Sequence, residues 1–317
     1  MKELLGRADR ALEPNAAHAP ATPGADARVR PRHSNRKRER AMNESTIFPI
    51  LVVSGTGKTG RRVVQRLQAR GLPVRSASRS GDVRFDWTDE ATWAGALRGV
   101  RSVYLSYQPD LAMPGAAAVI RAFCQAASRA GVRRVVLLSG RGEDDALPSE
   151  AAVRETVREW TILRAAFFCQ NFSEGMLQGA VLGGEIAFPA RDVAEPFVDA
   201  DDLADVAVAA LTEDVHIGKI YDLTGPRLLT FGDAAAEIAE AAGRAVRYVP
   251  IDSDTFQRAL SAEAPPEFAA FLTDLFARLL DGHNAKLGDG VERALGRRPR
   301  DFHEYARTAA SEGAWRG

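Results

Sequence analysis

Three closely spaced glycines interrupt an apolar run in the segment Ile50-Leu-Val-Val-Ser-Gly55-Thr-Gly57-Lys-Thr-Gly60-Arg-Arg-Val-Val64. A continuous apolar run such as Ile50–Val53 is typical of a buried parallel strand. Apolar residues then recur at helical spacing as far as Leu67, and Gly71 ends the predicted helix. The segment therefore predicts a strand, a tight turn and a helix.

The glycines have separate roles in a G-x-G-x-x-G pattern. Gly55 permits a tight turn, Gly57 lets backbone approach a pyrophosphate, and Gly60 lets the helix pack closely on the sheet. An anion would then lie at the N-terminus of the helix. A second predicted strand, 73–79, ends about 20 residues further on, which is the spacing expected in a dinucleotide-binding unit. We therefore predict a bound dinucleotide.

The end of the second strand indicates which dinucleotide is bound. An acidic residue there would accept hydrogen bonds from the ribose of NAD, whereas an arginine pairs with the 2′-phosphate of NADP. The chain has Ser78, Arg79 and Ser80 at this point and no acid. Lys58 in the glycine turn adds a second positive charge. We predict NADP(H); the alternative is that Arg79 and Lys58 are solvated surface charges.

The composition is that of an ordinary globular enzyme. The chain has 317 residues, of which 45% are hydrophobic and 26% charged, with a formal net charge of +0. This balance excludes a broadly basic nucleic-acid-binding protein. The two cysteines, Cys124 and Cys169, are far apart, so we expect no disulfide framework and a reducing, cytoplasmic compartment. No apolar run approaches the roughly 18 residues that span a bilayer, so we expect no membrane segment.

Residues 1–45 differ in composition from the rest. Their first 42 positions hold ten Lys and Arg against five Asp and Glu, with several prolines and no sustained apolar periodicity. Such a segment is predicted to be disordered. It is either a basic arm for nucleic acid or a tail without a role, with Met42 as the true start. We favour the tail, and expect no nucleic-acid partner, because no aromatic or folded element accompanies the arginines.

Strands and helices alternate from residue 46 onward. Further strands are predicted at 82–87, 100–104, 133–138 and 160–164, each separated from the next by a loop or helix. This alternation predicts an α/β fold, a Rossmann-type doubly wound parallel sheet. We expect residues 46–165 to be mainly cofactor-binding, and residues 166–317 to contribute a smaller, mostly helical substrate lobe.

Ligands of such sheets lie beyond the carboxyl ends of the strands, where Tyr107 and Ser139 fall. Beyond Ser139, residues 166–173 are predicted to enter a pocket. Three aspartates, Asp199, Asp201 and Asp202, precede a predicted helix, where the helix dipole accounts for them. No His or Cys accompanies them, and the histidines match no metal-binding spacing, so we predict no metal.

Several further segments resemble a known family. They are Phe85-Asp86-Trp87, Leu137-Leu-Ser139-Gly-Arg141-Gly, Trp160-Thr-Ile-Leu-Arg164, Phe168-Cys-Gln-Asn171-Phe-Ser, Phe197-Val-Asp199-Ala-Asp-Asp202, Leu280-Asp-Gly282 and Gly296-Arg-Arg-Pro299-Arg-Asp-Phe302. With the glycine turn, they make residues 46–317 similar to the NmrA-like atypical short-chain dehydrogenase/reductases. Within that group the chain most resembles the ergot-alkaloid-biosynthesis type, related to agroclavine dehydrogenases.

The resemblance implies roles for particular residues. The pyrophosphate would be held by Gly55, Thr56, Gly57, Lys58, Thr59 and Gly60. Arg79 would bind the 2′-phosphate and Asp86 the adenine, while Tyr107, Ser139 and the turn 164–168 would line the nicotinamide.

The expected acid of an ordinary short-chain reductase is missing. Those enzymes protonate an oxyanion with a tyrosine assisted by a lysine four residues later. Neither Tyr nor Lys occurs between Gly140 and Trp160, which disfavours ketone reduction by that mechanism. An activated acceptor, such as an iminium ion, quinone or conjugated carbonyl, needs mainly positioning. The resemblance favours such a reductase of a small molecule, in secondary metabolism. The alternative is a catalytically silent, NADP(H)-sensing regulator that acts through protein partners.

Four residues are candidates for contact with the acceptor. Tyr107 and Ser139 are predicted to hydrogen-bond the substrate, and Phe168 and Asn171 to shape its pocket. Alternatively, Tyr107 and Ser139 only fix the nicotinamide ribose. Arg141 either stabilises developing negative charge or is a surface residue without a role. The sequence leaves a homo-oligomer open.

Overall fold

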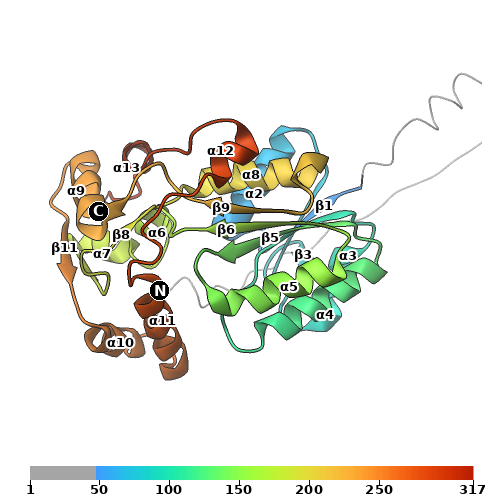
Figure 1. Ribbon diagram of the computed structural model, residues 1–317, viewed down its shortest axis with the longest axis horizontal. Coiled ribbons are helices and arrows are strands. Elements are labelled where there is room, and N and C mark those ends of the chain that lie inside the picture. Colours follow the sequence, from blue (N-terminus) through green and yellow to red (C-terminus); the bar gives the residue numbers. More distant parts are fainter. Residues whose placement is uncertain (1–47, 317) are drawn as a thin grey trace, which may run out of the picture. The chain divides into compact units, whose positions relative to one another are not determined.

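The computed structural model describes residues 48–316, which belong to one compact unit. The predictions for residues 1–45 lie outside the described residues. The unit is built on a seven-stranded sheet of order β3-β2-β1-β4-β5-β6-β9 (Figure 1). The strands are β1 (Ile50–Val53), β2 (Val74–Ser78), β3 (Val83–Arg84), β4 (Ser102–Leu105), β5 (Arg134–Gly140), β6 (Glu159–Ala165) and β9 (Lys219–Leu223).

All neighbouring strands of this sheet are parallel, and Ile50 lies opposite both Val74 and Ser102. The strand order reverses between β1 and β4. Ligands of doubly wound sheets bind outside the carboxyl ends of the strands at such a switch point. The Rossmann-type fold expected from the sequence is confirmed.

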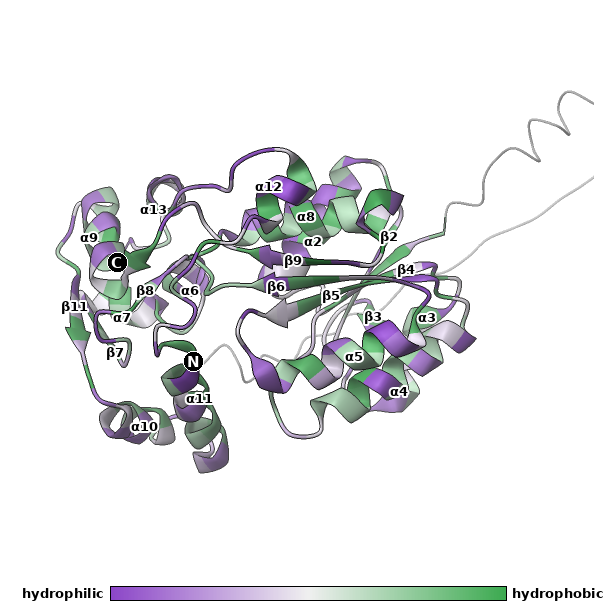
Figure 2. Ribbon diagram, viewed as in Figure 1, coloured by the Kyte–Doolittle hydropathy of each residue, from purple (hydrophilic) through white to green (hydrophobic). Residues whose placement is uncertain are grey.

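Helices cover both faces of the sheet (Figure 1). One face carries α3 (Trp93–Leu97), α4 (Ala116–Arg129) and α5 (Leu147–Thr156), and the other carries α2 (Lys58–Ala69), α8 (Ala200–Thr212) and α12 (Gly290–Leu295). Short 3-10 turns lie at Glu90–Thr92, Asp144–Ala146 and Asp214–His216. Helix α8 is hydrophobic along most of its length (Figure 2), because it packs on the sheet, on α2 and on α12.

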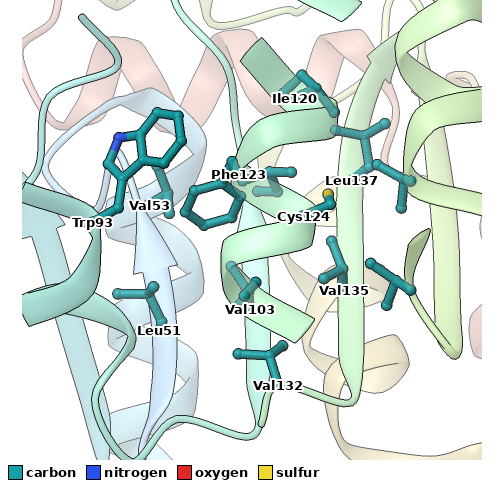
Figure 3. Packing of buried hydrophobic residues seen from close by; sticks show 14 of the residues in the cluster. Leu51, Val53, Trp93, Val103, Ile120, Phe123, Cys124, Val132, Val135 and Leu137 are labelled. Carbon is teal, nitrogen blue, oxygen red and sulfur yellow. The ribbon is translucent and has the colours of Figure 1, made fainter. Parts of the chain in front are cut away.

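The side chains of β1 alternate between the two faces of the sheet. Leu51 and Val53 belong to the core under α3–α5, whereas Ile50 and Val52 belong to the core under α2 and α8. Figure 3 shows the first core, where Phe123 of α4 lies among the strand residues. Both faces are thus buried, which explains why the strand is a continuous apolar run rather than an alternating one.

Cys124 is fully buried in the same core, on the apolar face of α4 (Figure 3). Burial raises the pKa of its thiol to about 12. Both cysteines of the chain are free and buried.

The second half of the chain adds a lobe beside the carboxyl ends of the strands. Its elements are α6 (Asn171–Glu174), α7 (Gln178–Gly183), β7 (Glu185–Phe188), β8 (Ala194–Glu195), β10 (Leu229–Thr230), α9 (Phe231–Ala242), β11 (Arg247–Pro250), α10 (Ser253–Ser261), α11 (Pro266–Leu279) and α13 (Phe302–Ser311). Strand β7 pairs parallel with β11, and β8 antiparallel with β10. An aromatic core holds the lobe together, with Phe188 stacked 4.9 Å from Phe231. The mostly helical C-terminal region is confirmed.

Local signals placed some elements better than others. Thr230 caps the N-terminus of α9 and forms a capping box with Asp233. The strand predicted over 82–87 shrinks to two residues. Asp86 leaves the ladder because its carboxylate accepts hydrogen bonds from the backbone N–H and hydroxyl of Thr88. Within residues 48–316, no helix has both the length and the apolar character to cross a bilayer.

Asp202 joins α8 to the C-terminal segment. Its carboxylate is fully buried and accepts hydrogen bonds from the backbone N–H of Arg300 at 2.6 Å and from the Arg300 guanidinium. Arg297 lies 2.7 Å away. The aspartates predicted at this helix start are therefore more than dipole partners, since Asp202 anchors two arginines from the end of the chain.

We expect Asp202→Ala to lower the free energy of unfolding by about 2 to 3 kcal/mol, because three charge-assisted interactions are lost. Urea unfolding measures this change. Asp289→Ala is the matched control, since that exposed carboxylate pairs with Arg293 at 3.4 Å, and we expect a change below about 0.5 kcal/mol. Equal losses in the two variants would show that Asp202 is no anchor.

Candidate functional site

The glycine turn between β1 and α2 leaves no room for side chains at two of its positions. A Cβ on Gly60 would lie 2.2 Å from the carbonyl oxygen of Ser54, and one on Gly55 would lie 2.3 Å from Oγ of Ser76. Gly57 is the N-cap of α2, and no side chain caps this helix. The first N–H groups of α2 are thus left for an external anion, which fits the pyrophosphate of a dinucleotide.

The structure brings three predicted residues together beside this turn. The ammonium of Lys58 donates a hydrogen bond to Oδ1 of Asn171 and lies 5.7 Å from the ring centre of Phe168. Burial, with help from Arg62 and Arg61, lowers the pKa of Lys58 to about 8. A phosphate would offset that loss of hydration, so Lys58 is suited to the anionic end of a cofactor.

Arg79 and Asp86 follow the carboxyl ends of β2 and β3, beside the glycine turn in the strand order. Arg79 directly follows β2 and is exposed, as a residue reaching for a 2′-phosphate must be. The carboxylate of Asp86 accepts hydrogen bonds from Thr88, and these hold its pKa below the usual value, with the nearby charge of Arg79 adding to the effect. These two residues do not line the cavity described next.

A cavity of about 430 Å³ lies at the carboxyl ends of the strands. Seven of the predicted residues line it: Gly57, Lys58, Thr59, Tyr107, Ser139, Phe168 and Asn171. Gly55, Thr56 and Gly60 form the turn behind it and do not line it. On its other side, α11 contributes an apolar wall of Leu272, Leu275, Phe276 and Leu279. The cavity therefore runs from a phosphate-binding turn to an apolar surface.

Tyr107 and Ser139 both line this cavity, but their settings differ. The ring of Tyr107 packs 4.9 Å from that of Trp87, and burial raises the pKa of its hydroxyl. The hydroxyl of Ser139 donates a 2.8 Å hydrogen bond to Glu150, which is 2% exposed. Arg164 donates two more hydrogen bonds to Glu150, at 2.9 and 2.7 Å. Because its proton is committed to Glu150, Ser139 offers a ligand an acceptor oxygen.

The turn after β6 lies where the sequence places it. Residues 165–168 line the cavity, whereas Arg164 turns to Glu150. Arg141 is buried and donates hydrogen bonds to the carbonyl oxygens of Asn284 and Lys286, at 2.8 and 2.9 Å. Arg141 is therefore neither a solvated surface residue nor free to bind a ligand with those two nitrogens.

Three carboxyl groups in the cavity wall were not among the predicted site residues: Asp110, Glu143 and Glu195. Burial and the neighbouring Asp110 raise the pKa of Glu143 to about 8, and burial raises the pKa of Glu195 to about 7. The only signal in the sequence was position, since Asp110 follows Tyr107 by three residues and Glu143 follows Ser139 by four. Within residues 48–316, no group of three or more His, Cys, Asp or Glu is placed to hold a metal ion.

Fold and site together define a Rossmann-fold protein that binds a nicotinamide dinucleotide beside an apolar cavity. A family model described as NAD(P)H-binding matches residues 55–214, and the chain belongs to this family. The NAD(P)H azoreductase of Xenophilus azovorans is 32% identical, over 83% of this chain and 98% of its own length. The agroclavine dehydrogenase of Claviceps fusiformis is 32% identical, over 81% and 95%.

Among solved structures, the NADP(H) complex of the Citrobacter sp. triphenylmethane reductase superposes with a TM-score of 0.66. It is 22% identical and covers 83% of this chain and 100% of that protein, which supports the fold. The relatives confirm the resemblance to agroclavine dehydrogenases and the class of NAD(P)H-dependent oxidoreductases. The individual site residues remain predictions.

We expect Gly60→Ala to weaken NADPH binding at least tenfold and to cost about 1 to 3 kcal/mol of stability, because its Cβ would displace the Ser54 carbonyl. Fluorescence titration and urea unfolding measure the two effects. Gly95→Ala in α3 is the control: its Cβ would meet nothing within 4 Å, so binding should be unchanged and stability equal or slightly higher. Unimpaired binding by the Gly60 variant would contradict the close-approach role.

Proposed function

We propose that this protein is an NADPH-dependent reductase that transfers a hydride to a small, activated organic acceptor. The acceptor class is an iminium ion, a quinone or a conjugated carbonyl compound, and the setting is secondary metabolism in the cytoplasm. One observation carries the proposal: a single cavity joins the phosphate-binding end of α2 to the apolar wall of α11. A cofactor and an apolar acceptor would share that space.

Each end of the cofactor has its own residues in this proposal. The N-terminus of α2 and Lys58 hold the pyrophosphate, Arg79 pairs with the 2′-phosphate, and Asp86 contacts the adenine. Tyr107 and Ser139 contact the nicotinamide ribose or the acceptor. When bound, the reduced nicotinamide supplies the hydride. The protein positions the two reactants and excludes water with the aromatic and aliphatic side chains around Phe168 and Phe276.

The names of the relatives support an organic acceptor of this kind. One is an azoreductase, one an agroclavine dehydrogenase and one a triphenylmethane reductase. The apolar wall of α11 suits a flat, largely hydrophobic molecule. We therefore propose a conjugated or cationic ring compound rather than a sugar or a simple alcohol.

A second candidate is a regulator that binds NADP(H) without turnover. It is favoured by the missing Tyr and Lys between Gly140 and Trp160. The two functions separate in one experiment on the full chain. NADPH and NADH are titrated, and the absorbance of the reduced nicotinamide is followed with quinones, cyclic iminium salts and enones. We expect tighter binding of NADPH and turnover with at least one acceptor. Tight binding without any turnover would favour the regulator.

The 2′-phosphate assignment has its own test. We expect Arg79→Glu to weaken NADPH binding about 30-fold and NADH binding less than about threefold, because only NADPH carries the phosphate that loses its partner. Arg129→Glu makes the same charge change at the exposed end of α4 and should leave both affinities unchanged. Calorimetric titration of both cofactors measures the effect, and equal losses for NADPH and NADH would overturn the assignment.

A further inference from the structure

Glu195 is the least exposed of the three carboxyl residues in the cavity wall. It ends β8, in the lobe opposite the glycine turn, and its residue is 4% exposed. Its Oε1 has no hydrogen-bond partner among residues 48–316. A buried polar atom without a partner is costly, and such atoms are uncommon in folded proteins. Since Glu195 lines the cavity, a ligand there is the natural partner for Oε1.

The charges around Glu195 leave it without a hydrogen-bonded cation. The charge of Arg141 lowers the pKa of Glu195, but the Arg141 guanidinium donates its hydrogen bonds to the backbone carbonyls of Asn284 and Lys286. His283 acts on Glu195 only through its charge, and Asp222 lies beside Arg141. Glu143 and Asp110 add negative charge to the same cavity when ionised. Burial raises the pKa of Glu195 to about 7, so its carboxyl is mostly protonated below about pH 7.

We propose that Glu195 is the catalytic acid, which donates its proton to the oxygen of a conjugated carbonyl or quinone as that acceptor is reduced. This inference rests on the proposed reductase function and narrows its acceptor class. It also supplies a proton donor in place of the tyrosine and lysine that the chain lacks. An iminium ion would need no such donor, because its reduction neutralises a positive charge and creates no oxyanion.

The proton and electron balance of the step is simple for an enone. The β-carbon of the acceptor gains a hydride, and a C–H bond forms there as a C–H bond of the reduced nicotinamide breaks. The π electrons of the C=C bond form a new double bond between the α-carbon and the carbonyl carbon, and the π electrons of the carbonyl bond move to its oxygen. The O–H bond of Glu195 breaks as a new O–H bond forms on that oxygen. The enol that results takes up a proton at its α-carbon and loses its O–H proton to solvent, which gives the saturated ketone. The acceptor is reduced by two electrons, the nicotinamide is left oxidised, and the Glu195 carboxylate regains its proton from solvent.

The test compares wild-type protein with Glu195→Gln, using NADPH and 2-cyclohexenone or menadione. We expect kcat to fall about 100-fold while KM changes less than about threefold, because the amide keeps the shape but cannot supply the proton. In the wild type, kcat should fall as pH rises through about 7, and this inflection should be absent from the variant. Glu185→Gln, on an exposed glutamate of the same lobe paired with Arg247, should behave as wild type.

A second readout needs no cofactor. Folding raises the pKa of Glu195 from 4.5 to about 7, so between these pH values the folded protein holds a proton that the unfolded chain releases. The free energy of unfolding therefore falls as pH rises through that interval. The amide of Glu195→Gln does not titrate. We therefore expect the Tm of the variant, relative to wild type, to be higher at about pH 8.5 than at about pH 4.5. A constant difference in Tm would overturn the proposal that Glu195 holds a proton near neutrality.

The remaining outcomes separate this inference from the function on which it rests. If wild type reduces the enone and Glu195→Gln does so equally well, Glu195 is not the acid. If Glu143→Gln abolishes turnover and the pH inflection while Glu195→Gln does not, the acid is Glu143. If Glu195→Gln raises KM for the iminium salt N-methyl-3,4-dihydroisoquinolinium and leaves kcat unchanged, Glu195 is an ionised anchor for cations and not the acid. If the wild type fails to oxidise NADPH with every acceptor tested, the reductase function itself fails, and the inference fails with it.

Discussion

The carbonyl oxygen of Ser54 occupies the space that a side chain at position 60 would need. This close approach sets α2 tightly against β1, so the helix begins directly at the carboxyl end of the sheet. The direction of α2 then determines much of the site. Its first turn faces the cavity through Lys58, and farther along, Arg62 and Arg66 reach the acidic residues Asp201 and Asp205 of α8. One backbone contact thereby positions both the anion-binding turn and the helix face that pairs with α8.

The cavity is lined by groups of both charge signs. Its phosphate-binding end has a helix N-terminus and a buried ammonium, which favour an anion. Its wall also has three carboxyl groups, two of them with pKa values raised into the neutral range. Burial disfavours ionisation of these carboxyls, and keeping them protonated avoids a cluster of negative charge beside a bound dinucleotide. The arrangement suits an enzyme that must bind phosphates and handle protons in one space.

Sequence patterns predicted the parts of the molecule that depend on local chemistry. The glycine spacing at residues 55–60 located the turn, because backbone geometry leaves a direct trace in the sequence. The partnership of Ser139, Glu150 and Arg164 left no such trace, since it joins two strands and a helix across the sheet. No sequence pattern pointed to Glu195 either. Its importance comes from burial and from the lack of a partner, which only tertiary structure creates.

The chain returns to the main sheet with β9 after it has begun the second lobe with α6–β8. It then leaves again to add β10–α11, returns to the sheet with α12, and ends in the lobe with α13. The lobe is therefore built from three separate stretches of chain, and no single cut in the chain releases it whole. A truncation after β6 would also strip the sheet of an edge strand. A lobe of this construction cannot be exchanged as one segment, so the wall that it gives the cavity changes by substitutions and loop changes within the lobe.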